Sequence, residues 1–105
     1  MDRKFVESLG WTFGSSWANR DVYNLGDFMI IEHNGSWSIA NGADWYAIED
    51  TGEEMLTEFT NLIKKLYEIY NNPENHTLAE YFKAGEDIRT FYNKNGYTEE
   101  DNLEC

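Results

Sequence analysis

Residues 28–40 read FMIIEHNGSWSIA, and this stretch decides the fold class of the chain. Two runs that favour β-strands, residues 28–33 and 37–40, flank the pair Asn34-Gly35. Asparagine and glycine both accept the positive φ angles that a two-residue type I′ turn requires. Residues 28–40 are therefore predicted to form a β-hairpin.

Further short β-favouring runs lie on both sides of this hairpin. Val22-Tyr23 precedes it, and Trp45 to Ile48 follows it after a second turn signal at residues 41–44. Residues 11–19 are rich in aromatic residues, Gly and Ser without a clear period, so they are predicted to form an irregular strand or a connection. Together these runs predict an antiparallel β-meander of three or four strands.

Helical patterns lie at both ends of the chain. Residues 2–9 place apolar side chains on one face of a short helix, which Gly10 would end. Residues 53–70 carry a long apolar stripe, with a possible capping box at Thr51 and Glu54. The stripe consists of Met55, Phe59, Leu62, Leu66 and Ile69.

A third helix is predicted from Thr77 or Leu78 to about Asn93. Thr77 and Glu80 form a second capping-box pattern, and Gly85 would either permit a close helix contact or split the helix. The apolar side of this helix is predicted to contain Leu78, Tyr81, Phe82, Ile88 and Tyr92.

The order of these elements predicts an α+β fold. We expect an N-terminal helix, the β-meander and two C-terminal helices packed on the sheet, in one domain over residues 1–105, with residues 97–105 as a flexible acidic tail. No stretch approaches the ~18 apolar residues of a membrane helix, and no signal-peptide pattern opens the chain. We therefore expect a cytoplasmic protein.

Motifs for catalysis are absent from the sequence. There is no nucleophile elbow, phosphate loop or dinucleotide fingerprint, and the two histidines, His33 and His76, are far apart. His33 is expected at a strand end and His76 in solvent. The single cysteine, Cys105, cannot form an intramolecular disulfide. We expect neither an enzyme nor a cofactor or metal site.

The net charge of −12 comes from 20 acidic and 8 basic residues, and it is concentrated in two segments. Residues 44–63 and 95–105 contain ten acidic residues and no Lys or Arg. Such segments are either solvated faces or surfaces for a basic partner. The candidate partner-binding residues are Asp44, Glu49, Asp50, Glu53, Glu54, Glu58, Glu99, Glu100, Asp101 and Glu104.

The charge also excludes some partners and leaves alternatives open. Strong acidity opposes direct binding to nucleic acid or to an anionic membrane and favours a basic protein. An immunity protein that neutralises a basic toxin or nuclease would have the same size and charge. A small ligand- or sugar-binding domain would instead use exposed tryptophans, of which Trp11 and Trp17 are the best candidates.

The combination of element order, length and acidity resembles the small phage-encoded anti-CRISPR proteins, some of which occupy the DNA-binding groove of Cas9 as DNA mimics. No motif matches residue by residue, so the resemblance transfers no family site. It implies a protein-binding inhibitor whose partner is a Cas effector nuclease in the bacterial host cell. It also implies that the acidic groups of residues 44–58 and 99–104 are the contacts.

Overall fold

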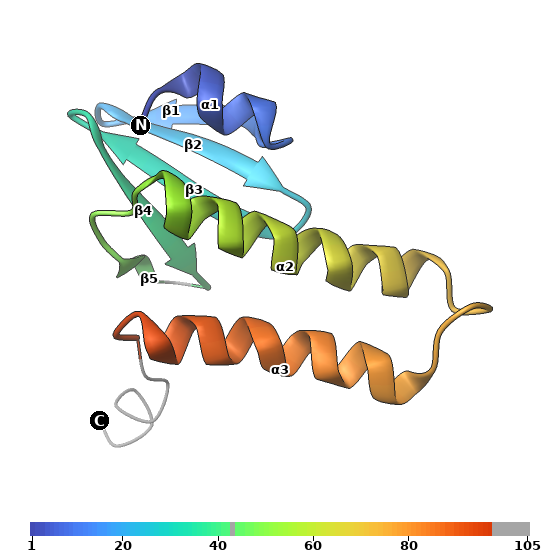
Figure 1. Cartoon of the computed structure of the whole chain (residues 1–105). Coiled ribbons are helices and arrows are strands. Elements are labelled where there is room, and N and C mark those ends of the chain that lie inside the picture. Colours follow the sequence, from blue (N-terminus) through green and yellow to red (C-terminus); the bar gives the residue numbers. More distant parts are fainter. Residues whose placement is uncertain (43, 98–105) are drawn as a thin grey trace. The chain divides into compact units, whose positions relative to one another are not determined.

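The computed structural model describes residues 1–42 and 44–97, which form an α+β arrangement of five strands and three helices (Figure 1). The chain divides into two compact units, Met1–Thr57 and Glu58–Cys105. We call them unit 1 and unit 2. The boundary lies inside the long helix α2, Glu53–Asn71, so α2 contributes residues to both units.

Unit 1 begins with the short helix α1, Arg3–Ser8, as the sequence predicted. The Asp2 carboxylate caps it by accepting a hydrogen bond from the Phe5 backbone N–H at 2.9 Å. Gly10 follows the helix with a φ of 108°, in the left-handed region that suits glycine after a helix end.

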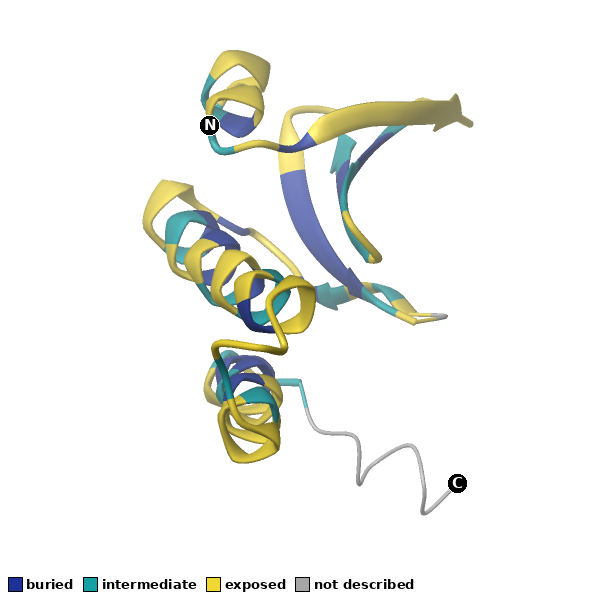
Figure 2. Cartoon of the chain, turned by 90° about the vertical axis from the view of Figure 1, so that its right-hand side faces the viewer, coloured by how far each residue is buried: buried dark blue, intermediate teal, exposed yellow. Residues whose placement is uncertain are grey.

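The sheet of unit 1 has five antiparallel strands in the order β1-β2-β3-β4-β5. The sequence predicted three or four, because residues 12–17 lack a regular period. They pair with the next strand nonetheless, through a β-bulge between Phe13 and Ser15, and all six residues of β1 are exposed (Figure 2). The strands are β1 Thr12–Trp17, β2 Arg20–Leu25, β3 Phe28–His33, β4 Ser36–Asn41 and β5 Asp44–Ile48.

The predicted hairpin is confirmed between β3 and β4. His33 pairs with Ser36 across the turn, and Ile30 pairs with Ile39 further along the ladder. Asn34 and Gly35 have φ angles of 52° and 86°, the positive values that a type I′ turn requires. The strand pairing therefore fixes which side chains share each face of the sheet.

Both faces of the central strands are buried. Tyr23, Ile30 and Ile39 lie on one face, since they pair directly across β2, β3 and β4. On the other face Val22, Ile31 and Ala40 form a cluster, against which Met29 and Trp45 pack. Ser38 and Trp37 on β4 are also buried, so this strand has no solvent-facing side over its central residues.

The start of α2 differs from the prediction. Thr51 does not cap the helix, because its hydroxyl donates to the Ile48 carbonyl at 3.2 Å. The Gly52 carbonyl instead accepts the helical hydrogen bond from the Leu56 N–H at 3.0 Å. The capping box predicted from Thr51 and Glu54 is therefore wrong, although the helix begins within two residues of it.

Unit 2 contains the rest of α2 and the helix α3, Leu78–Lys94, whose predicted capping box is confirmed. The Phe59 ring stacks on Phe91 with centroids 5.0 Å apart and meets Tyr92 edge-on at 5.6 Å. α3 is continuous through Gly85, so the glycine does not split it. Within the described residues, every helix is too short or too polar to cross a bilayer.

The predicted apolar side of α3 is wrong at two positions. Leu78 and Phe82 are 69% and 60% exposed. The buried residues of this helix are Ala84, Ile88, Phe91 and Tyr92. The packing of the two C-terminal helices on the sheet stays a prediction, and so does the tail, of which residues 98–105 lie outside the described part.

Candidate protein-interaction surface

Five of the predicted partner-binding carboxylates lie close together along the chain in unit 1. We call them the acidic surface: Asp44, Glu49, Asp50, Glu53 and Glu54. Asp44 opens β5, the next two residues form the connection to α2, and the last two lie in the first turn of α2. All five side chains are exposed, so their charges face solvent.

Four of these carboxylates have no partner among the described residues. Glu49, Asp50, Glu53 and Glu54 form neither a side-chain hydrogen bond nor an ion pair there, whereas Asp44 accepts a hydrogen bond from the Tyr46 N–H at 3.1 Å. Some acidic groups elsewhere are compensated. Asp21 pairs with Arg3, and Asp87 pairs with Lys83.

The backbone at Asp50 has an unusual conformation. Its φ is 55°, in the left-handed region where residues other than glycine are strained and only Asn and Asp are well tolerated. Glycine would relax this position. The chain instead has a carboxylate there, in the middle of the acidic surface.

Part of this charge has a structural explanation. Glu53 and Glu54 stand in the first turn of α2, where the helix dipole favours negative charge by ~0.3–1 kcal/mol for each group. This does not account for Glu49 and Asp50, which precede the helix and add like charges to the same segment.

Glu58, also predicted to bind the partner, lies one turn further along α2 in unit 2. Its carboxylate forms an ion pair with Lys94 of α3 at 2.6 Å. Glu58 thus has a local role, tying the two helices of unit 2 together. The other four predicted residues, Glu99, Glu100, Asp101 and Glu104, lie outside the described residues.

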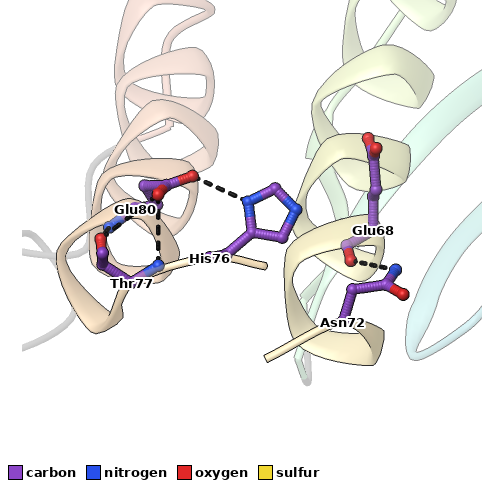
Figure 3. A network of polar contacts seen from close by, with 5 residues as sticks. All are labelled: Glu68, Asn72, His76, Thr77 and Glu80. Atoms are coloured by element: carbon purple, nitrogen blue, oxygen red, sulfur yellow. Dashed lines mark hydrogen bonds and ion pairs between the residues drawn. The ribbon is translucent and has the colours of Figure 1, made fainter. Parts of the chain in front are cut away.

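His76 and Glu80 belong to a network of polar contacts in unit 2 (Figure 3). His76 Nδ1 lies 2.8 Å from Glu80 Oε2, while Glu80 Oε1 accepts a hydrogen bond from the Thr77 N–H at 3.2 Å. The hydrogen bond with His76, followed by that from Thr77, lowers the pKa of Glu80. His76 was expected in solvent and is partly exposed, with 24% of its side chain accessible.

This group caps α3. The Thr77 hydroxyl accepts from the Glu80 N–H at 3.2 Å and donates to Glu80 Oε1 at 3.4 Å, so its contacts are those of the capping box and none is with His76. His33 ends β3, as predicted, in the other unit. Among the described residues, no group of three His, Cys, Asp or Glu side chains is arranged to hold a metal ion.

The two candidate ligand-binding tryptophans differ in exposure. Trp11 is 1% exposed and belongs to the core, so its proposed ligand role is wrong. Trp17 is 67% exposed and meets Trp45 edge-on with centroids 6.1 Å apart. One exposed tryptophan therefore remains from the pair of candidates.

Comparison with known proteins gives no family assignment. No protein-family model, curated protein or solved structure matches the chain. The sequence did not predict the pairing of Glu58 with Lys94, because it depends on a contact between α2 and α3. The charge and geometry of the surface are therefore the basis for a function.

Proposed function

We propose that this protein is an inhibitor that binds a basic, nucleic-acid-binding protein through the acidic surface and does not itself catalyse a reaction. The observation that supports this proposal is the run of four exposed, unpaired carboxylates within residues 49–54. A basic partner would neutralise charges that the described part of the chain leaves uncompensated.

The arrangement of these carboxylates suits a groove that normally holds nucleic acid. Glu53 and Glu54 are consecutive in the first turn of α2, and a nucleic-acid strand likewise carries closely spaced negative charges along its backbone. Glu49 and Asp50 extend this row of charge beyond the start of α2. Lys and Arg side chains that contact phosphates could therefore contact these carboxylates instead.

Electrostatic attraction would raise the rate of association as well as stabilise the complex. Complementary potentials raise association rates, and the effect falls as salt screens the charges over ~10 Å at 0.1 M. The resemblance to anti-CRISPR proteins makes a Cas effector nuclease the first partner to test. A toxic nuclease would offer the same kind of basic, nucleic-acid-binding groove.

The experiment is affinity capture of host proteins, followed by mass spectrometry, with three forms of the protein. The wild type is compared with the triple variant Asp50→Asn, Glu53→Gln, Glu54→Gln. The control is Glu7→Gln, Glu32→Gln, Glu68→Gln, which removes the same charge from other sites. Asparagine also tolerates the left-handed backbone of residue 50, so the first variant removes charge without adding strain there.

We expect the wild type and the control to retain the same nucleic-acid-binding protein at ~0.1 M salt and to lose it at several-fold higher salt. The acidic-surface variant should not retain it at either concentration. Circular dichroism checks that all three forms are folded. If the acidic-surface variant captured the same partner as the wild type, the proposal would be wrong.

A further inference from the structure

Two adjoining pockets open on the helical hairpin of unit 2. The first has a volume of about 460 Å³ and is formed by the end of α2, the connecting loop and the start of α3. The second has a volume of about 310 Å³ and lies further along α3. Tyr81 lines both, so the two pockets lie next to each other on either side of this side chain, and we call the pair the hairpin groove. The lining of the hairpin groove includes Leu66, Tyr70, Leu78, Tyr81, Phe82 and Gly85.

The hairpin groove exposes large apolar side chains. Tyr70, Leu78 and Phe82 are 63%, 69% and 60% exposed, and all three lie within thirteen residues along the chain. Leu78 and Phe82 are one helical turn apart and share a face of α3. Several large apolar side chains exposed together, beside a pocket, are typical of a protein-binding site.

Gly85 lies in the middle of α3, where glycine lowers helix stability relative to alanine. Glycine inside a helix usually reflects a positive φ or a close neighbour. Gly85 is not among the residues with positive φ, and a Cβ built there would meet no atom within 4 Å. Neither the backbone conformation of Gly85 nor its surroundings in this chain therefore require glycine. The close approach of a partner backbone to α3 at this point would require it.

The rim of the hairpin groove is acidic. Glu74 in the loop and Glu86 on α3 are exposed and pair with no described residue. Glu80 lies beside the first pocket, bound to His76. Of the nearby cations, Lys83 is already paired with Asp87, and Arg89, which lines the second pocket, also has an interaction within the chain. An apolar groove with such a rim favours a ligand with an apolar face and positive flanks.

We propose that the hairpin groove binds an amphipathic, basic α-helix of a protein partner. Apolar side chains of that helix would fill the two pockets on either side of Tyr81. Its backbone would cross α3 at Gly85, and its Lys or Arg side chains would face Glu74 and Glu86. This is the helix-in-groove mode of recognition. The groove uses no residue of the acidic surface, so the two proposals can fail separately.

The test is selection from a displayed library of helical peptides about 16 residues long, which span ~24 Å. Apolar residues are fixed at every third or fourth position, and all others are randomised. We expect the enriched peptides to carry an excess of Lys and Arg. Amide NMR shifts of the full chain with the best peptide should centre on Tyr81, Phe82 and Gly85.

Two variants then separate groove binding from general stickiness. Gly85→Ala should raise Tm by about 4–6 °C, because alanine favours the helix, while it weakens peptide binding at least tenfold. Phe82→Ala should also weaken binding at least tenfold. Phe13→Ala is the matched control, since Phe13 is a similarly exposed phenylalanine in unit 1, and it should bind as the wild type does.

Four results would overturn the proposal. They are a failure to enrich basic peptides, NMR shifts centred outside the groove, unchanged binding in both Gly85→Ala and Phe82→Ala, and self-association of the protein through this face in sedimentation experiments. The last result would assign the groove to a second copy of the chain. Because Gly85→Ala is expected to stabilise the fold, loss of binding in this variant cannot be explained by unfolding.

Discussion

Truncation of Phe59 to alanine should destabilise unit 2 strongly. Phe59 is fully buried, stacks on Phe91 and meets Tyr92 edge-on. Loss of its burial costs ~1.5–3 kcal/mol, loss of aromatic contacts adds ~0.5–1.5 kcal/mol, and the remaining cavity brings the total to ~3–5 kcal/mol. This is a large part of the ~5–15 kcal/mol expected for a chain of this size.

Urea unfolding followed by circular dichroism at 222 nm measures this change. With a denaturant slope of ~2 kcal/mol/M, a loss of 4 kcal/mol moves the midpoint by ~2 M. Tyr70→Ala is the control, because Tyr70 is a 63% exposed aromatic residue of the same helix, and we expect a change of only ~0.5 kcal/mol. A loss below ~1 kcal/mol for Phe59→Ala would refute the reasoning that the aromatic stack is the core of unit 2.

Three further predictions concern single sites. In His76→Ala the pKa of Glu80 should rise towards its ordinary value, as carboxyl NMR titration would show. The lowered pKa in the wild type means that Glu80 stabilises the fold above its unfolded pKa, a contribution lost as pH falls through the folded pKa. Gly35→Ala should cost ~1–2 kcal/mol in chemical denaturation, because its φ of 86° strains any side chain although the space around it is open. Trp11→Ala should lower the free energy of unfolding by ~3–5 kcal/mol and Trp17→Ala by less than ~1 kcal/mol, because only Trp11 is buried. If the wild type bound a glycan array and Trp17→Ala did not, a ligand site at Trp17 would be favoured over the acidic surface.

The sequence predicted those elements whose signals are local. Asn34-Gly35 specified the hairpin because its two residues accept positive φ, and Thr77 with Glu80 specified the start of α3 because a capping box needs only four residues. The sequence signal for strand β1 was weaker. Its bulge lies at Gly14, where an added Cβ would displace the side-chain amide of Asn24, and this contact between strands cannot be read from residues 11–19 alone.

Features that depend on contacts distant in sequence were missed. Lys94 compensates Glu58 from 36 residues away, so a search for cations three or four residues along the helix could not find it. α3 has apolar residues on two sides, and periodicity alone does not decide that Phe91 is buried while Leu78 is exposed. The acidic surface could be predicted because it is nearly continuous along the chain.

The most direct test of the central claim is competition with nucleic acid for the captured partner. The partner is bound to a labelled duplex at ~0.1 M salt, and the protein is added while fluorescence anisotropy reports the bound duplex. We expect the wild type to displace the duplex and the variant Asp50→Asn, Glu53→Gln, Glu54→Gln to fail, while the protein alone binds no duplex. Displacement by the variant as efficient as that by the wild type would contradict the claim that these carboxylates occupy the nucleic-acid groove.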